Sequence, residues 1–173
     1  LRLRPDPNST PVCISTEMAE RYYESVGRTW ERAAYIKARA CAGDIAAGEG
    51  FIKTLRPFVW RKHLDFAAIQ DAHDMRLKIR NHKGLHGPLV LEGHNIKLGR
   101  GGIREIEFIV QTLQLVRGGT IVQLRERRLL PALQQLGVHR LLPEQAVTEL
   151  TDAYCYLRLI ENHIQAIQDR QTH

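Results

Sequence analysis

The chain has few cysteines, and they form no recognisable pattern. Cys13, Cys41 and Cys155 are odd in number, lie far apart and include no C-x-x-C pair. This spacing excludes a disulfide framework and a zinc knuckle built on cysteine. We expect three buried free thiols instead, because an unpaired cysteine usually behaves as a small hydrophobic residue. His82, His86 and His94 lie close in sequence but lack a paired acid or cysteine, so we predict no metal site on them.

Long hydrophobic runs are also absent. The longest apolar runs are a few residues, whereas a helix that crosses a bilayer needs about 20. No charged stretch followed by an apolar core opens the chain, as a secretory signal would. We therefore expect a cytoplasmic protein with no membrane partner.

Aromatic residues make up only 6% of the chain, so there are few platforms on which bases could stack. The formal net charge of +6 would suit nucleic acid if the cations were clustered. They are instead interleaved with acids, as in the segment 30–44, "WERAAYIKARACAGD". This distribution is typical of a mildly basic solvated surface, and we expect no nucleic-acid partner.

What is present is an ordinary globular composition, with 43% hydrophobic and 25% charged residues in 173. That length suits one domain or parts of two. The first residues, "LRLRPDPNSTPVCIS", alternate apolar and polar positions on both sides of a turn cluster, which predicts a short β hairpin. Because the alternation begins at Leu1 itself, the chain has the character of a fragment.

Helical periodicity follows from Ser15 to the end. Ser15 or Thr16 can cap the first helix, and Thr29 can cap a second that ends at Gly43. Further helices are predicted over 44–62, interrupted by Gly48, Gly50 and Pro57, and over 64–80, before an irregular loop at 81–93.

The last third predicts a helix opened or kinked by Pro131 and a long helix with Pro143 at its first position. The apolar residues of the long helix recur every three or four positions, which predicts a single buried stripe. They are Val147, Leu150, Tyr154, Leu157, Ile160, Ile164 and Ile167.

The loop "KLGRGGIREIEF" places three glycines between two cations and the start of a helix. Glycine allows close backbone approach, and a helix start exposes N–H groups that favour an anion. One interpretation is a seat for phosphate or carboxylate. The other is a tight connection before a helix whose own acids, Glu105 and Glu107, satisfy its dipole.

Two helices share one polar skeleton, R-x-I-E-x-x-x-Q-x-x-Q, at 104–114 and 158–168. Its polar members fall on one helical face. We predict that the two stripes meet across a helix–helix interface, with Arg104 or Arg158 near the glutamate of the opposite stripe and the glutamines satisfying one another. The alternative is two solvent-facing stripes that match by chance.

Five segments, taken in order, resemble the glutamine synthetase adenylyltransferase/adenylyl-removing family. They are "LRLRPDPNSTP", "YYESVGRTWERAAYIKAR", "RPFVWRKHLDFAAIQ", "IKLGRGGIREIEFIVQTLQLVRGG" and "AYCYLRLIENHIQAIQDRQTH". Family members are long proteins with two related nucleotidyltransferase halves, each followed by a helical domain. The segments "GGIREIEF" and "FVWRKHLDFAAIQ" are similar to the N-terminal half, which removes AMP from glutamine synthetase by phosphorolysis and yields ADP.

The resemblance implies a mainly α fold: a short β hairpin and helices left from a truncated polymerase-β-like nucleotidyltransferase domain at 1–57, then a helical bundle at 58–173. It also implies Mg²⁺, ATP or ADP, and phosphate as the reaction's metal and substrates. Glutamine synthetase and a PII-type signalling protein would be the partners. The metal carboxylates of the family are expected before Leu1, so we predict no catalytic residue in this chain and no activity for it in isolation.

The resemblance also selects site candidates. Candidates for binding nucleotide or phosphate are Arg2, Arg4, Trp30, Glu31, Lys37 and Arg39. Candidates for shaping the site or a domain interface are Lys97, Gly101, Gly102, Arg104, Glu105 and Glu107. Lys37 would lie beside Trp30 on one helical face; its alternative role, and that of Arg39, is in surface ion pairs with Glu31 and Asp44. Arg2 and Arg4 could equally be cations that protect an edge strand.

Two rival functions remain beside the AMP-removing half. The chain could come from the half that attaches AMP from ATP, or it could act as a non-catalytic helical module that binds the regulator or glutamine synthetase. The sequence before Leu1 would separate the first rival.

Overall fold

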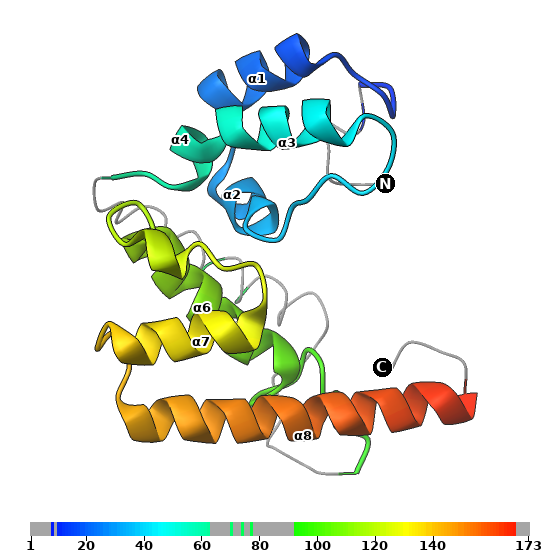
Figure 1. Cartoon of the computed structure of the whole chain (residues 1–173). Coiled ribbons are helices and arrows are strands. Elements are labelled where there is room, and N and C mark those ends of the chain that lie inside the picture. The colour runs from blue at the N-terminus through cyan, green and yellow to red at the C-terminus, as the bar shows by residue number, and fades with distance from the viewer. Residues whose placement is uncertain are drawn as a thin grey trace.

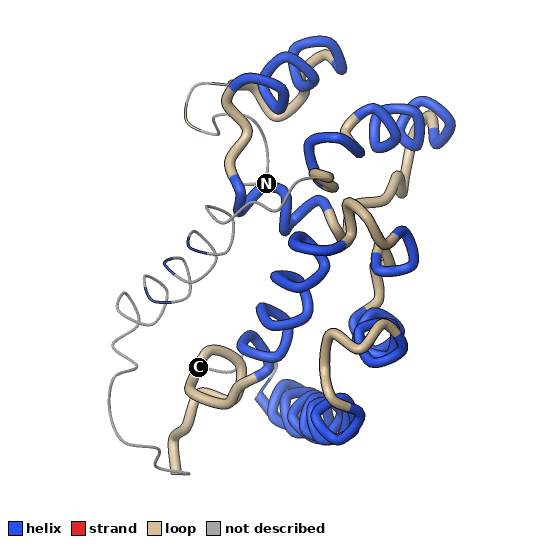
Figure 2. Tube along the Cα trace, turned by 90° about the vertical axis from the view of Figure 1, so that its left-hand side faces the viewer, coloured by secondary structure: helices blue, strands red, loops and turns tan. Residues whose placement is uncertain are grey.

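A computed structural model describes residue 8, residues 10–62, residues 70, 74 and 77, and residues 92–168. These residues form helices and loops, with no strand among them (Figures 1 and 2). The helices are α1 (Thr16–Ser25), α2 (Thr29–Tyr35), α3 (Ile45–Thr54), α4 (Arg56–Val59), α6 (Ile103–Arg117), η1 (Val122–Leu124), α7 (Leu129–Val138) and α8 (Glu144–Gln168). The predicted mainly α fold is confirmed.

The predicted β hairpin is not formed in the described residues. Its first strand, with Arg2 and Arg4, lies outside them, while residues 10–14 form turns and irregular backbone. Val12 is 65% exposed, and Ser15 caps α1 by accepting a hydrogen bond from the Met18 amide at 3.2 Å. A strand needs a neighbour to pair with, and alternation of residue type does not supply one. No sheet of a nucleotidyltransferase domain is present in the described part either, so that detail gains no support.

The second predicted helix ends eight residues early, at Tyr35 instead of Gly43. Ile36, which follows it, is 3% exposed and packs with Val59 of α4 and Leu115 of α6. Tertiary burial therefore overrides the helical pattern of the segment 36–43. Lys37 follows the end of this helix, so the predicted helical face that joins Trp30 and Lys37 is not formed.

The glycines of α3 do not interrupt it. Asp44 caps this helix by accepting a hydrogen bond from the Ala47 amide at 2.9 Å, and the helix continues through Gly48 and Gly50. The break comes at Leu55, and Pro57 lies in the first turn of α4, where its missing N–H costs little. The predicted domain boundary at 57/58 falls inside α4, and the division itself stays a prediction.

Three clusters of buried side chains hold the helices together. One joins α6, η1, α7 and the first half of α8; a second joins α1 to Leu55 at the end of α3. The third, formed by Ile36, Val59 and Leu115, connects α2 and α4 to α6. In Figure 1, α1 to α4 lie together above, and α6, α7 and α8 lie below.

The long helix α8 begins at Glu144, directly after Pro143, whose carbonyl accepts a hydrogen bond from the Val147 amide at 3.1 Å. Its predicted apolar stripe is only half correct. Val147, Leu150, Tyr154 and Leu157 pack on the core of α6 and α7, but Ile167 is 81% exposed. Periodicity shows which side chains share a face, and it does not show how far a partner helix extends along that face.

The cysteine prediction is wrong, because Cys13, Cys41 and Cys155 are all exposed. The predicted helix 64–80 and loop 81–93 lie almost entirely outside the described residues; Gln70, Asp74 and Leu77 are helical, and residues 92–93 form a turn. Among the described helices, none has both the length and the apolar character needed to cross a membrane.

Candidate functional site

The glycine loop before α6 folds around one asparagine. The Asn95 side-chain oxygen accepts hydrogen bonds from the amides of Lys97 at 3.1 Å and Leu98 at 2.8 Å. The Gly99 amide donates to the Asn95 carbonyl at 2.7 Å. An asparagine that bonds the backbone ahead of it is typical of a tight turn, so the loop has a defined shape without a ligand.

The N–H groups at the start of α6 already have partners. The Ile103 amide donates to the Ile96 carbonyl at 3.0 Å, and the Arg104 amide donates to the Lys97 carbonyl at 2.9 Å. The Gly101 amide donates to the Glu105 carboxylate at 3.0 Å. An anion at this helix start would have to displace these bonds, so the geometry favours a tight connection over a phosphate seat.

Two glycines of the loop are required by backbone geometry. Gly101 has φ +73°, a conformation that residues with a side chain rarely adopt. At Gly102, a Cβ would lie 2.7 Å from the Ile96 carbonyl oxygen and 2.9 Å from that of Gly99. These positions bring residues 96–99 against the start of α6, which places Lys97 beside that helix.

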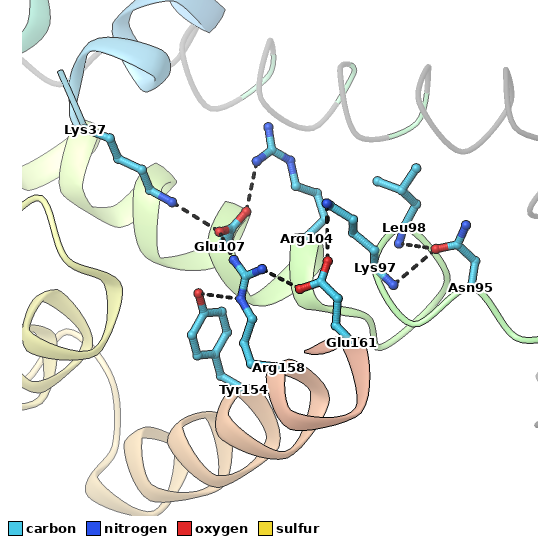
Figure 3. A network of polar contacts seen from close by, with 9 residues as sticks. All are labelled: Lys37, Asn95, Lys97, Leu98, Arg104, Glu107, Tyr154, Arg158 and Glu161. Atoms are coloured by element: carbon cyan, nitrogen blue, oxygen red, sulfur yellow. Dashed lines mark hydrogen bonds and ion pairs between the residues drawn. The ribbon is translucent and has the colours of Figure 1, made fainter. Parts of the chain in front are cut away.

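Beyond the loop, two buried glutamates organise a network of cations (Figure 3). Glu107 of α6 accepts hydrogen bonds from Lys37 at 3.1 Å, from Arg104 at 2.9 Å and from Arg158 of α8 at 3.3 Å. Its side chain is 7% exposed, and those of Lys37 and Arg104 are each 42% exposed. One carboxylate therefore ties the segment after α2 to both long helices.

Glu161 is the second centre. Arg158 donates through Nη1 to its Oε2 at 2.6 Å, and Lys97 Nζ forms an ion pair with its Oε1 at 3.3 Å. Arg158 also donates through Nε to the Tyr154 hydroxyl at 3.0 Å. Arg158 thus binds both glutamates and a neighbour on its own helix, and Figure 3 shows it between them.

The predicted meeting of the two R-x-I-E stripes is confirmed, with Arg158 near Glu107 of the opposite stripe. The predicted pairing of their glutamines is wrong for Gln114. Its side-chain amide donates to the carbonyls of Leu124 at 2.6 Å and Glu126 at 2.8 Å. A buried amide takes the nearest acceptors, and here those are the backbone around η1.

The network keeps both carboxylates ionised. Burial alone would raise the pKa of Glu107, but the attraction of Lys37 and the hydrogen bond from Arg104 outweigh it and leave the pKa below its usual value. The pKa of Glu161 is lowered in the same way, with hydrogen bonds from Arg158 and Lys97 overcoming burial. Four cations around two carboxylates leave a net positive charge at this junction.

Two family models match different parts of the chain. Residues 73–173, more than half of the chain, match the family model described as GlnD PII-uridylyltransferase. Residues 1–54 match the model described as Glutamate-ammonia ligase adenylyltransferase. Over all 173 residues, the chain is 56% identical to the bifunctional glutamine synthetase adenylyltransferase/adenylyl-removing enzyme of Rhodopseudomonas palustris (strain TIE-1). The chain belongs to the glutamine synthetase adenylyltransferase/adenylyl-removing family.

Other relatives of the same description give the same result. The chain is 57% identical over its whole length to the enzyme of Bradyrhizobium sp. (strain BTAi1) and 53% identical to that of Mesorhizobium japonicum. It spans only 17% to 18% of the length of these adenylyltransferase/adenylyl-removing enzymes. The predicted family is therefore confirmed, and the chain corresponds to a small part of such an enzyme.

Four of the candidates for binding nucleotide or phosphate, Trp30, Glu31, Lys37 and Arg39, have different surroundings in the structure. Glu31 is 1% exposed and accepts hydrogen bonds from the Arg28 amide at 2.8 Å and the Tyr22 hydroxyl at 3.2 Å. Trp30 is 38% exposed. Lys37 turns to Glu107 rather than to Glu31 or Asp44, and Arg39 is exposed. The four residues do not form one site in the described structure, and their binding roles stay predictions.

The network contains residues that the site prediction omitted. Arg158 and Glu161 belong to it as fully as Arg104 and Glu107 do. Both residues belong to the repeated R-x-I-E pattern at 158–168, which is the sequence signal for them. Arg2 and Arg4 lie outside the described residues.

The Mg²⁺ that the family resemblance implies finds no matching donors here. Within the described residues, no three His, Cys, Asp or Glu side chains gather in a way that could hold a metal ion. Glu107 and Glu161 are already bonded to cations, which would repel another. We therefore assign these residues no step that involves a metal.

Proposed function

We propose that the chain is part of an enzyme that controls glutamine synthetase by reversible adenylylation, and that it comes from the half that removes AMP. In that reaction an oxygen of phosphate attacks the phosphorus of the tyrosine-bound AMP and the bond from that phosphorus to the tyrosine oxygen breaks, so that ADP forms and the tyrosine oxygen takes up a proton. Support comes from identity above 50% over the whole chain to bifunctional enzymes of that description. The segments "GGIREIEF" and "FVWRKHLDFAAIQ" support the removing half.

Within this function, the chain connects a catalytic domain to a helical one. The observation that carries this role is the Glu107 carboxylate, which accepts Lys37 from the N-terminal part and Arg158 from α8. A catalytic group must be held to within a fraction of an ångström of its working position. The buried network around Glu107 and Glu161 would supply that rigidity beside the catalytic site of the parent enzyme. The rest of the enzyme would bind Mg²⁺, ATP or ADP, and phosphate.

Two rivals keep specific support. The half that attaches AMP from ATP shares the family description of every relative compared. A binding module for glutamine synthetase or a PII-type protein would use an exposed helix, and α8 exposes Tyr156, Leu159 and Ile167 to solvent.

The test uses the intact parent enzyme, in which both activities can be measured on the same preparation. Arg158→Gln should lower ADP release from adenylylated glutamine synthetase by roughly 10- to 100-fold, the scale of a misplaced catalytic geometry. AMP attachment from ATP should stay near its original rate. The isolated 173-residue chain should release no ADP.

Arg21→Gln is the matched control, because Arg21 is 77% exposed and its one ion pair among the described residues is with Glu17 on α1. It should leave both activities unchanged. If Arg158→Gln lowers AMP attachment and spares ADP release, the chain belongs to the other half. If it lowers neither while binding of glutamine synthetase weakens, the module interpretation replaces ours.

A further inference from the structure

A pocket of about 350 Å³ lies between the N-terminal helices and the segment that follows α6. This volume is in the range of about 300 to 1,000 Å³ that small-molecule sites occupy. Its walls come from three places in the sequence: the end of α2, α3 with α4, and the loop around η1. None of its lining residues belongs to the Glu107 and Glu161 network.

Three arginines and one acid line this pocket: Arg56, Arg125, Arg127 and Glu49. Among the described residues, none of the three arginines has a carboxylate partner. Elsewhere among the described residues, Lys37 and Arg158 both pair with a glutamate. Three arginines and one glutamate leave an excess of positive charge around the pocket, and an anion would lower the electrostatic free energy there.

Arg125 is held in position. Its Nε donates to the Gly118 carbonyl at 2.7 Å and its Nη2 to the Gly119 carbonyl at 3.3 Å. Its guanidinium lies 5.8 Å from the centre of the Trp60 ring. No described residue accepts from Nη1, so this edge of a fixed guanidinium remains for a ligand. Burial, and then the proximity of Arg56, lower the pKa of Arg125.

Gly118 and Gly119, whose carbonyls bind Arg125, allow the backbone beside the pocket to pack closely. A Cβ on Gly118 would lie 2.6 Å from the Trp60 ring, and one on Gly119 would lie 1.8 Å from the Arg61 carbonyl oxygen. Only glycine lets residues 60–61 approach this closely. This close approach brings Trp60 to the turn whose carbonyls accept the hydrogen bonds of Arg125.

The pocket also has an apolar part in its lining. Ile36, Ile52, Leu55 and Val59 line the pocket together with the ring of Tyr35. A site that took only an inorganic ion would need no such surface, whereas an organic ligand would bury its carbon atoms against it.

We propose that this pocket binds a small organic anion, with its phosphate or carboxylate groups on Arg56, Arg125 and Arg127 and its apolar part on the Ile36 side. The proposal does not depend on which reaction the parent enzyme catalyses. A planar guanidinium pairs with carboxylate and phosphate through the same two-pronged geometry, so both chemistries fit.

The experiment measures the thermal unfolding of the 173-residue chain with AMP, citrate or inorganic phosphate at constant ionic strength, balanced with sodium chloride. AMP or citrate should raise Tm by roughly 5 °C at 100-fold excess over Kd, and the increase should saturate. Arg56→Gln and Arg127→Gln should each remove at least half of it. Both residues are exposed, so these variants should fold normally, which their Tm without ligand will verify.

Arg21→Gln again supplies the control, since it removes one exposed positive charge that does not line the pocket. A larger increase in Tm with AMP than with citrate would indicate that the pocket prefers a phosphate-bearing ligand. A larger increase with citrate would indicate a polycarboxylate. If Arg21→Gln and Arg127→Gln lost the same share of the ligand-induced increase in Tm, the increase would come from non-specific charge screening, which would overturn the proposal. So would stabilisation by inorganic phosphate without AMP or citrate, or no saturable response to any of the three.

Discussion

Arg158 of α8 and Glu107 of α6 form an ion pair at 3.3 Å although they are 51 positions apart in sequence. The same glutamate holds Lys37 and Arg104, and the same arginine holds Glu161. Because both carboxylates are almost fully buried, removal of one would leave cations without a counter-charge in a poorly solvated place. The pair therefore couples the stability of α6, α8 and the segment after α2.

Glu107→Gln and Glu161→Gln should each lower the free energy of unfolding by about 1–3 kcal/mol, the cost of a buried charged group that loses its partner. The double variant should cost less than the sum of the two, since Arg158 contacts both glutamates and can be left unpaired only once. Urea unfolding of the four proteins measures this coupling. Strict additivity would show that the two carboxylates act independently.

Acid should weaken the wild-type chain more than the double variant. The pKa values of Glu107 and Glu161 are lowered by their cations, so the folded state binds fewer protons than the unfolded state near pH 4. This stability is fully present above the unfolded pKa, near 4.5, and is lost as the pH falls through the lower folded pKa. Tm measured from pH 7 to pH 3 should fall more steeply for the wild type below about pH 5.

Glu126 supplies the control for this experiment. Its pKa is also lowered, first by the side-chain hydrogen bond from Arg128, but that arginine is 76% exposed. Glu126→Gln should therefore leave the acid limb of the Tm curve nearly unchanged. A flattening as large as that of the double variant would assign the acid sensitivity to surface charge instead of the junction.

Local signals in the sequence predicted most of the helices. Ser15 and Asp44 both cap helices, as their residue types favour, and Pro143 marks the start of α8. Three inferences that needed a partner failed: a strand at 10–14, the extension of α2 past Tyr35 and the burial of Ile167. Periodicity is a property of one segment, whereas pairing and burial depend on a second.

The candidate site divides in the same way. The repeated R-x-I-E skeleton predicted the contact of Arg158 with Glu107, because two matching charged stripes can satisfy each other. The same repeat did not predict Lys37 or Lys97 as the remaining partners, since each comes from a loop whose path tertiary packing decides. The arginines of the pocket were missed because Arg56 and Arg125 are 69 positions apart and share no motif.

The two glycines of α3 should respond oppositely to alanine. At Gly50 a Cβ would meet nothing within 4 Å, so Gly50→Ala should stabilise the chain by roughly 0.5–1 kcal/mol through helix propensity. At Gly48 a Cβ would lie 2.7 Å from the Ala40 Cβ, and the clash should cancel or reverse that gain. Thermal unfolding of the two variants tests this; equal gains would mean that the segment near Ala40 yields without cost.

Gly119→Ala should be the most damaging glycine replacement. The added Cβ would lie 1.8 Å from the Arg61 carbonyl oxygen and 3.0 Å from the Lys62 Cα, so backbone would have to move. We expect a loss of about 1–3 kcal/mol in unfolding free energy and a weaker response to the anions that the Arg125 pocket binds. Gly50→Ala serves as the comparison variant. A Gly119→Ala protein with wild-type stability would show that residues 60–62 are not held against this turn.

Lys37 and Arg39 can be separated by comparing stability with activity in the intact parent. Lys37 Nζ is bonded to Glu107, so Lys37→Ala should cost roughly 0.5–1 kcal/mol, reduced from a fully buried pair because the lysine is 42% exposed. Arg39 is exposed and has no such bond among the described residues, so Arg39→Ala should leave Tm unchanged.

If Arg39 binds the adenylyl phosphate, its loss should lower phosphorolysis by roughly 10- to 1000-fold, the scale of a charge-assisted contact in a transition state. Restoration of the rate in Arg39→Lys would identify the charge as the cause. A Lys37→Ala enzyme with unchanged Tm and a rate lower than that of Arg39→Ala would reverse the assignment and make Lys37 the phosphate ligand.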